Sequence, residues 1–218
     1  MSMLDVVGPV MVGPSSSHTL GALKIARFAY KLFGEKPEKV EYYLHGSFAK
    51  TYLGHGTDRA LIAGILGLRE YDYEIKNAYN LAKKQNLKYS FIESDLGDVH
   101  PNTVLIRMFK DKKINEIQGA SVGGGAIKIT KINGVDCDLS GDYNTLIIVN
   151  KDIKGALENI LKIIHVNVAN LYLKRTNIIE GKSLTILELD EKPINLNELE
   201  KLECVIKYFY VGSDKDEI

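Results

Sequence analysis

The sequence predicts an α+β fold in two domains, residues 1–141 and 143–218 of a chain of 218 residues. Two observations support this prediction. Helical and strand-like patterns are mixed before Gly141, which favours an α+β layer over a helical bundle. The tail from Tyr143 then alternates the same patterns in the order βαββαβ.

Three helices are expected in the first domain, over 20–33, 57–68 and 75–84. The first has apolar residues at helical spacing and is stopped by Gly34, and the second can be capped by Thr57 or Asp58. Alternating or β-branched runs predict four strands, over 40–44, 104–109, 113–117 and 126–132.

The second domain is expected to be a ferredoxin-like βαββαβ unit. β-Branched runs predict its strands over 144–150, 166–175, 183–189 and 204–211. Helical patterns predict its two helices over 153–165 and 196–202. A polar turn over 177–182 separates the second strand from the third.

Composition excludes several classes of protein. The chain has 28 Lys+Arg and 28 Asp+Glu, so its neutral balance argues against bulk electrostatic capture of nucleic acid or of an anionic membrane. No apolar run approaches the ~18 residues of a membrane-spanning helix, and no secretory signal is evident. Cys137 and Cys204 are the only cysteines, which predicts a cytoplasmic setting and too few ligands for a four-cysteine metal site on this chain.

The densest chemical signal is Gly13-Pro14-Ser15-Ser16-Ser17-His18-Thr19, directly before the first expected helix. Free N–H groups and the helix dipole favour an anion at such a position, and the hydroxyls add donors. A carboxylate or a phosphate would fit. The alternative is that one serine caps the helix and the others are ordinary loop residues.

A second signal is His55, which stands between Gly54 and Gly56 just before the second expected helix. Flanking glycines let a backbone come close to a ligand, and a histidine there can act as base, acid or anion donor. The alternative is a simple turn with His55 exposed to solvent.

Two weaker signals follow. Pro101 holds His100 extended in the segment Asp98–Thr103, and the glycines at 123–125 could form a nest of N–H groups for an anion. An ordinary polar loop and a flexible turn are the alternatives.

Together these segments resemble the beta chain of iron–sulfur-dependent L-serine dehydratase (L-serine ammonia-lyase). The resemblance is carried, in this order, by GPSSSHTLGALKIA, HGSFAKTYLGHGTDRA, HPNT and SVGGG, and it covers roughly residues 4–140. The tail resembles an ACT domain, a small-molecule sensing module. The family's beta domain also resembles the allosteric substrate-binding domain of some phosphoglycerate dehydrogenases, so similar architecture can serve sensing as well as catalysis.

The resemblance implies L-serine as substrate, a partner alpha subunit that holds a 4Fe-4S cluster, and homodimerisation through one or both domains. A cluster iron with an open position would act as a Lewis acid on the substrate, and elimination would lead to pyruvate and ammonia. His55 is expected in an acid–base role, with His18 as the second candidate or as an electrostatic stabiliser. The expected substrate-binding residues are Ser15, Ser16, Ser17, Thr19, His100, Asn102, Gly123 and Gly124.

In the tail, the resemblance implies an effector site formed by Asp152, Gly155 and Asn167. Lys154 stands where ACT domains often have proline, but Gly155 can still admit a ligand near the helix start. An ACT domain used only for dimerisation is the alternative, because fold does not fix function.

Other classes of function compete with this interpretation. Ser47-Phe48-Ala49-Lys50 and the triple glycine superficially resemble a pyridoxal-phosphate dehydratase, but that fold needs a much longer chain and its lysine stands one residue closer. A serine-sensing regulatory module without catalysis would use the same anion cradle. A purely structural subunit is the third alternative, since no complete catalytic set lies on this chain.

Overall fold

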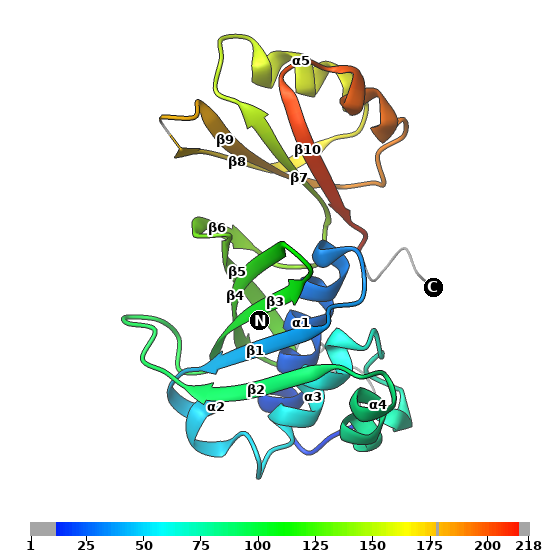
Figure 1. Cartoon of the computed structure of the whole chain (residues 1–218), viewed down its shortest axis with the longest axis vertical. Helices are drawn as coiled ribbons and strands as arrows, with labels where there is room; N and C mark the ends of the chain where they lie inside the picture. Colours follow the sequence, from blue (N-terminus) through cyan, green and yellow to red (C-terminus); the bar gives the residue numbers. More distant parts are fainter. Residues whose placement is uncertain (1–11, 178, 214–218) are drawn as a thin grey trace. The chain divides into compact units, whose positions relative to one another are not determined.

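The computed structural model describes residues 12–177 and 179–213 and has an α+β architecture built on two β-sheets (Figure 1). The chain divides into two units, the first ending at Ser140 and the second beginning at Gly141. The mixed α+β class predicted from the sequence is therefore confirmed. Within these described ranges, no helix is long and apolar enough to cross a membrane.

The first unit contains a six-stranded sheet in the order β2-β1-β3-β4-β5-β6. Its strands are β1 (Lys39–Leu44), β2 (Lys88–Glu93), β3 (Thr103–Lys110), β4 (Lys113–Gly123), β5 (Ala126–Ile132) and β6 (Val135–Leu139). Strands β1 and β2 are parallel, and the other neighbours are antiparallel. Its helices are the π-helix η2 (Ser16–Leu20), α1 (Gly21–Phe33), α2 (Gly46–Thr51), α3 (Thr57–Ile65), the 3₁₀ helix η3 (Tyr73–Asn77) and α4 (Ala78–Lys84).

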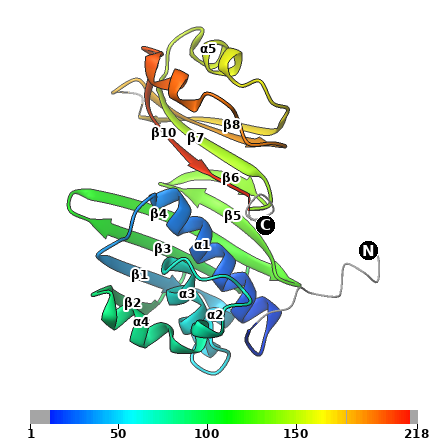
Figure 2. The same ribbon diagram turned by 90° about the vertical axis from the view of Figure 1, so that its right-hand side faces the viewer.

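Helix α1 lies across one face of this sheet and packs against β4 and α3 (Figure 2). Its buried stripe includes Ile25, Ala29 and Leu32, and it ends at Gly34, which has a φ of 76° and donates its N–H to Tyr30 O at 3.1 Å. The predicted helix and its stop are confirmed. A Cβ on Gly64 of α3 would lie 2.5 Å from Leu23 O, so a glycine is needed where the two helices approach.

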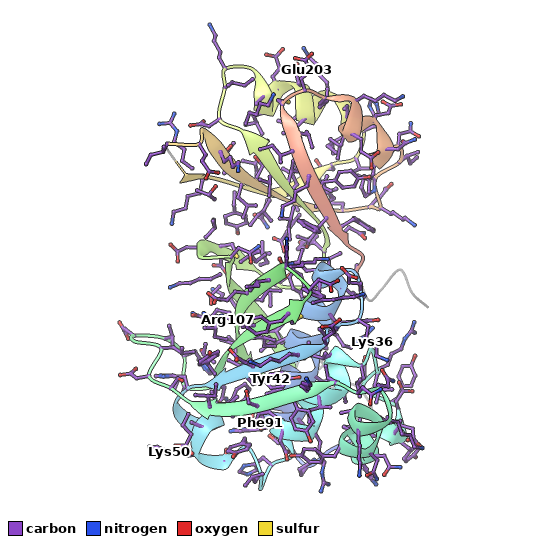
Figure 3. The ribbon with its side chains drawn as sticks, viewed as in Figure 1. Lys36, Tyr42, Lys50, Phe91, Arg107 and Glu203 are labelled. Atoms are coloured by element: carbon purple, nitrogen blue, oxygen red, sulfur yellow. The ribbon has the colours of Figure 1, made fainter. Side chains whose placement is uncertain are left out.

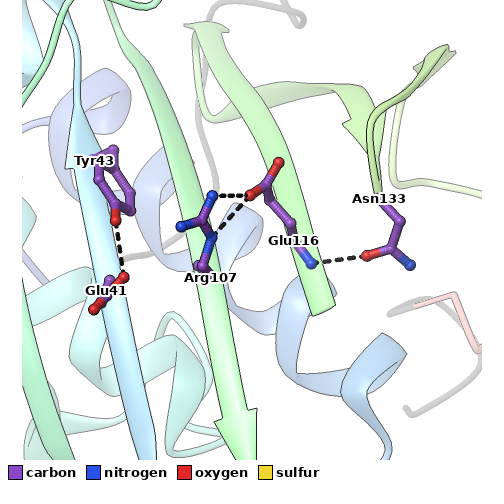
Figure 4. Close-up of polar contacts among 5 residues, drawn as sticks. All are labelled: Glu41, Tyr43, Arg107, Glu116 and Asn133. Atoms are coloured by element: carbon purple, nitrogen blue, oxygen red, sulfur yellow. Dashed lines mark hydrogen bonds and ion pairs between the residues drawn. The ribbon is translucent and has the colours of Figure 1, made fainter. Parts of the chain in front are cut away.

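The two faces of the sheet differ because successive strand residues point to opposite sides. Tyr42 is fully buried, donates its hydroxyl to Leu61 O at 3.3 Å, and stacks on Phe91 of β2 with ring centroids 5.0 Å apart (Figure 3). The neighbouring Glu41 and Tyr43 therefore face away from the helices. The same outer face carries a two-pronged ion pair between Arg107 and Glu116, with Nε–Oε2 at 2.9 Å and Nη2–Oε2 at 2.6 Å (Figure 4).

Several first-unit predictions need correction. Helix α2 and strands β2 and β6 were not expected, and the strand expected over 113–117 continues to Gly123. The helix expected over 75–84 begins as a 3₁₀ turn. The helix expected over 57–68 ends at Ile65, and its N-cap is Gly56 at a φ of 69°, with no side-chain capping bond from the described residues. A left-handed glycine turns the chain into this helix, so Thr57 and Asp58 are its first helical residues and do not cap it.

The second unit contains an antiparallel sheet in the order β10-β7-β9-β8. Its elements are β7 (Asn144–Lys151), α5 (Ala156–Ile163), β8 (Val168–Asn177), β9 (Lys182–Leu189), the 3₁₀ helix η4 (Leu196–Lys201) and β10 (Val205–Val211). Their order follows the predicted βαββαβ pattern, except that the second helix is 3₁₀. This helix follows the left-handed Asn195, and 3₁₀ geometry is found mostly in short helical segments. Ile160 and Leu199 from the helices pack on Leu146 and Leu187 of the sheet.

Candidate functional site

Four of the segments singled out in the sequence pack together around the π-helix Ser16–Leu20, and glycines mark their contacts. A Cβ on Gly21 would lie 2.0 Å from Ser121 Oγ, and one on Gly125 would lie 2.5 Å from a methyl of Leu20. A Cβ on Gly46 would lie 2.7 Å from the carbonyl oxygen of Pro101. These backbones approach so closely that side chains on the glycines would collide with their neighbours.

The π-helix begins at Ser15, whose extended backbone and hydroxyl cap it. Ser15 Oγ accepts a hydrogen bond from His18 N at 3.2 Å, and Ser15 O accepts from Leu20 N at 3.3 Å, which is the wide i to i+5 bond of a π-turn. The turn runs directly into α1 at Gly21, whose N–H bonds Ser16 O. Ser16 is the first π-helical residue and is partly buried. The predicted hydroxyl cluster therefore lies at the start of a continuous helical segment.

His18 is the centre of the cluster, because both of its ring nitrogens contact hydroxyls. Nδ1 lies 3.1 Å from Ser17 Oγ, and Nε2 lies 3.0 Å from Ser47 Oγ of helix α2. Ser17 Oγ also lies 3.3 Å from Ser15 Oγ. The edge of the ring meets buried Phe48, with centroids 5.6 Å apart. A chain of four polar groups thus runs from Ser15 through Ser17 and His18 to Ser47.

His55 joins this cluster from the loop before α3. Its ring is exposed, as the simple-turn interpretation expects, but its centroid lies 4.8 Å from that of His18. Thr19 Oγ1 donates to His55 O at 2.9 Å, and His55 N donates to Thr51 O at 3.1 Å. The loop is therefore tethered so that the two candidate catalytic histidines lie side by side.

The surroundings of His18 favour its neutral form. Partial burial lowers the pKa of His18 below its ordinary value, and the nearby charge of His55 lowers this pKa further. A neutral imidazole has one protonated and one free nitrogen, so His18 can donate at one side and accept at the other.

The segment with His100 and Asn102 supports the cluster through its backbone. Asn102 N donates to His100 Nδ1 at 3.1 Å, and Pro101 O accepts from Ser47 N at 2.8 Å. Asn102 O accepts from Ser121 N at 3.0 Å, which joins the segment to the end of β4. Within the described residues, the buried Asn102 Oδ1 and Ser121 Oγ have no hydrogen-bond partner.

The triple glycine closes the turn between β4 and β5. Gly123, Gly124 and Gly125 have φ values of 108°, 59° and 81°, which only glycine adopts readily. Gly125 packs on Leu20 of the π-helix, so the turn adjoins the cluster. Ligand binding by Gly123 and Gly124 stays a prediction.

A buried acid holds the first turn of α3, immediately after the His55 loop. Asp58 is 3% exposed, and the Tyr79 hydroxyl of α4 donates to its Oδ2. Burial raises the pKa of Tyr79 well above its ordinary range, and the Asp58 carboxylate adds to this shift. The pair fixes the helix that follows His55.

The predicted effector residues lie in the second unit and are not gathered in one place. Asp152 follows β7, where its Oδ2 lies 2.5 Å from Arg175 Nε, and Gly155 is the left-handed N-cap of α5 at a φ of 85°. Asn167 donates to Asp190 Oδ2 at 2.6 Å. Because β7 pairs with β9 antiparallel, Asp190 lies beside the start of β7 and Asp152 beyond its end. Asn167 and Asp152 are thus at opposite ends of the sheet within one chain.

Ser47 and Phe48 also belong to the site and were not predicted as site residues, although both stand in the segment that contains His55. Their partner His18 lies far away along the chain, so no local spacing signals the contact. In the described part of the chain, no group of three or more His, Cys, Asp and Glu residues could hold a metal ion. Cys137 and Cys204 belong to different units.

A family model and two full-length relatives all match this chain as similar to serine dehydratase beta chains. A protein-family model described as "Serine dehydratase beta chain" matches residues 2–90. The probable L-serine dehydratase beta chain of Bacillus subtilis (strain 168) is 40% identical over 211 residues, which cover 94% of this chain and 96% of that protein. The L-serine dehydratase beta chain of Peptoniphilus asaccharolyticus is 40% identical over 198 residues and covers 88% of both chains.

Two other similarities are more limited. The L-serine dehydratase of Helicobacter pylori (strain J99) is 33% identical over 142 residues, covering 55% of this chain and 31% of that longer protein. Among solved structures, S. aureus homoserine dehydrogenase at pH 6.5 matches 54% of this chain and 34% of its own, with 18% identity and a TM-score of 0.23. That score is too low to support a shared fold.

Proposed function

This chain belongs to the serine dehydratase beta-chain family, and we propose that it is the beta subunit of an L-serine dehydratase that converts L-serine to pyruvate and ammonia. One observation carries the catalytic part of this proposal. Two histidines from separate motifs lie with ring centroids 4.8 Å apart, beside a helix start lined with hydroxyls. The two imidazole rings could transfer protons, and the adjacent helix start could bind a carboxylate.

The cofactor belongs, in this proposal, to a partner alpha subunit. The described residues of this chain offer no cluster of metal ligands, so they do not fit a 4Fe-4S group by themselves. An iron–sulfur cluster on the partner would supply Lewis-acid activation of the substrate hydroxyl. The alpha subunit would therefore have to dock against the hydroxyl and histidine cluster described above.

The hydroxyl cluster would bind the substrate carboxylate. Ser15, Ser16, Ser17 and Thr19 lie at the beginning of the π-helix and α1, where the helix dipole is positive. Ser15 and Ser17 are partly exposed, so a carboxylate bound there would accept the hydroxyl protons that these serines, in its absence, can give to Ser17 and His18. This assignment makes the serines responsible for substrate affinity.

The histidines would move the protons. Dehydration of L-serine removes the Cα proton and expels the hydroxyl group as water, so one proton must be taken up and one delivered. His55 is exposed and can reach a bound substrate, and we assign it the acid–base role. His18, with its lowered pKa, would orient and stabilise the reacting groups as a neutral ring. The product aminoacrylate would then tautomerise and hydrolyse to pyruvate and ammonia.

We also propose that the second unit is an ACT-type sensor. Its βαββ order, its sheet order β10-β7-β9-β8 and the left-handed Gly155 before α5 support this assignment. Because Asp152 and Asn167 lie at opposite ends of one sheet, an effector site that uses both would need two copies of the chain. Such a site would couple effector binding to homodimerisation.

The test is an anaerobic activity measurement. This chain is purified alone and together with the alpha subunit from the same organism, and pyruvate formation from L-serine is measured. Turnover only in the iron-containing complex, lost in air, is the expected result. A cluster-loaded complex without turnover would contradict the enzyme proposal, and serine binding to such a complex would favour a sensing module.

A further inference from the structure

Both ring nitrogens of His18 contact serine hydroxyls, one on each side of the ring. Ser17 Oγ lies 3.1 Å from Nδ1 and Ser47 Oγ lies 3.0 Å from Nε2. A neutral imidazole carries one proton, so one of these hydroxyls must donate to the ring and the other must accept from it. The two serines are therefore coupled through the ring, and the tautomer of His18 decides the direction of both bonds.

Ser47 is held in place by bonds to its backbone and by the packing of its neighbour in α2. Its N–H donates to Pro101 O at 2.8 Å, and its carbonyl accepts from Thr51 Oγ1 at 2.8 Å. The adjacent Phe48 is fully buried and packs its ring against His18. Ser17, in contrast, makes its side-chain contacts with its near neighbours Ser15 and His18. The contact that fixes the position of the His18 ring therefore comes from Ser47 on helix α2.

One direction of these bonds uses every contact of Ser15. Ser15 Oγ accepts from His18 N and can donate its own proton to Ser17 Oγ at 3.3 Å. Ser17 can then donate to Nδ1, which places the ring proton on Nε2 and makes Ser47 Oγ its acceptor.

We propose that Ser47 is a positioning residue that holds His18 in one orientation and in the Nε2–H tautomer. Its hydroxyl oxygen accepts from Nε2, and helix α2 keeps that oxygen in place. The consequence for turnover rests on the proposed function, but the effect on the tautomer does not. Ser47 acts through His18 and is assigned no contact with substrate.

The direct test is nitrogen NMR of the imidazole ring in the full-length chain. The wild-type ring should show one protonated and one unprotonated nitrogen with well-separated resonances, and Nε2 should be the protonated one. Ser47→Ala should bring the two resonances closer together, because the tautomers then mix. Ser47→Thr keeps a hydroxyl and should preserve the wild-type spectrum. An unchanged separation in Ser47→Ala, or a protonated Nδ1 in the wild type, would overturn the proposal.

Two controls separate a specific effect from damage to the helix. Thr51→Ala removes a side-chain bond to Ser47 O within α2 without touching His18. The bond from Ser47 N to Pro101 O and the packing of Phe48 stay, so the ring resonances should not change. If Ser47→Ala does not fold, Ser47→Cys offers a near-isosteric side chain that is only a weak acceptor. It should produce the same convergence of resonances, and wild-type resonances in that variant would contradict the proposal.

The activity test uses the anaerobic complex with alpha. Ser47→Ala should lower kcat by about tenfold, the rate effect of losing one ordinary hydrogen bond, and should leave KM nearly unchanged. A raised KM with normal kcat would contradict a positioning role. If the wild-type complex itself makes no pyruvate, the proposed function fails while the NMR result still decides the role of Ser47.

Discussion

The imidazole rings of His18 and His55 lie with their centroids 4.8 Å apart at an interplanar angle of 37°. One ring belongs to the π-helix before α1 and the other to the loop before α3. At this separation the charge of His55 opposes protonation of His18 and adds to the effect of burial on the pKa of His18.

The first prediction concerns the pKa of His18. Proton NMR titration of the full-length chain should give a pKa for His18 below 6.5, because burial and the charge of His55 both oppose its protonation. His55→Ala should raise this pKa only part of the way, since burial is the larger cause and stays. A pKa that does not change in His55→Ala would show that the rings are not coupled.

The second prediction concerns stability at low pH. Because the folded-state pKa of His18 lies below its unfolded value, the unfolded chain binds more protons on acidification. The stabilisation is fully present above about pH 6.5 and declines as the pH falls toward the lowered pKa, with a slope below ~1.4 kcal/mol per unit. The ring is only partly buried, so a shallow decline is expected.

Urea unfolding measured between pH 7.5 and pH 5 in roughly half-unit steps should reveal this decline, and His18→Gln should remove part of it. His165→Gln is the matched control, since His165 is exposed and lies in the second unit. A wild-type curve parallel to that of His18→Gln would contradict the predicted linkage.

The third prediction concerns catalysis. In the anaerobic complex, His55→Ala should reduce turnover by at least about 100-fold while leaving assembly with alpha intact, because general acid–base groups contribute on this scale. The ring of His55 is exposed and its loop is held by backbone bonds, so the substitution should not unfold the unit. Near-normal kcat in a well-assembled complex would remove His55 from the acid–base role, and His165→Ala provides the control.

Local patterns in the sequence were enough to predict part of the fold. Helix α1 and its end at Gly34 follow from apolar spacing and a left-handed glycine. Strand β2 has Lys88, Tyr89 and Glu93 exposed at an edge of the sheet, so it lacks the alternation by which strands are recognised. The helix expected over 196–202 is 3₁₀, which was not predicted because neither apolar spacing nor propensity separates the two helical forms over six residues.

Less of the candidate site than of the fold could be predicted from the sequence. The motif with His18 and the motif with His55 could each be found, because unusual residues cluster in them. Their contact depends on tertiary packing, including the close approach of Gly21 to Ser121, which has no local signature. The hydrogen bond between Ser47 and His18 joins residues far apart in the chain, so no local sequence pattern indicates it either.

The fourth prediction tests the packing beneath the π-helix. Gly21→Ala should lower the free energy of unfolding by about 1–2 kcal/mol, because its Cβ would lie 2.0 Å from Ser121 Oγ and 2.5 Å from Ser121 Cβ. The gain in helix propensity, about 1 kcal/mol, only partly offsets this clash. Adding Ser121→Gly should restore stability in the Gly21→Ala background. Gly54→Ala, whose nearest contact would be 3.8 Å away, is the control.

The last prediction concerns the pair formed by Tyr79 and Asp58. Tyr79→Phe removes the hydroxyl that donates to Asp58, and Asp58 Oδ1 already has no hydrogen-bond partner in the described structure. The buried carboxylate would then lack its side-chain donor, at a cost of about 1–3 kcal/mol. The N-terminus of α3 offsets part of this cost, since a carboxylate is favourable in the first turn.

Amide hydrogen exchange in α3 should therefore be faster in Tyr79→Phe than in the wild type. Tyr73→Phe is the control, since Tyr73 is 79% exposed, and it should leave this exchange unchanged. Unaltered exchange in Tyr79→Phe would mean that packing alone holds α3 behind the His55 loop.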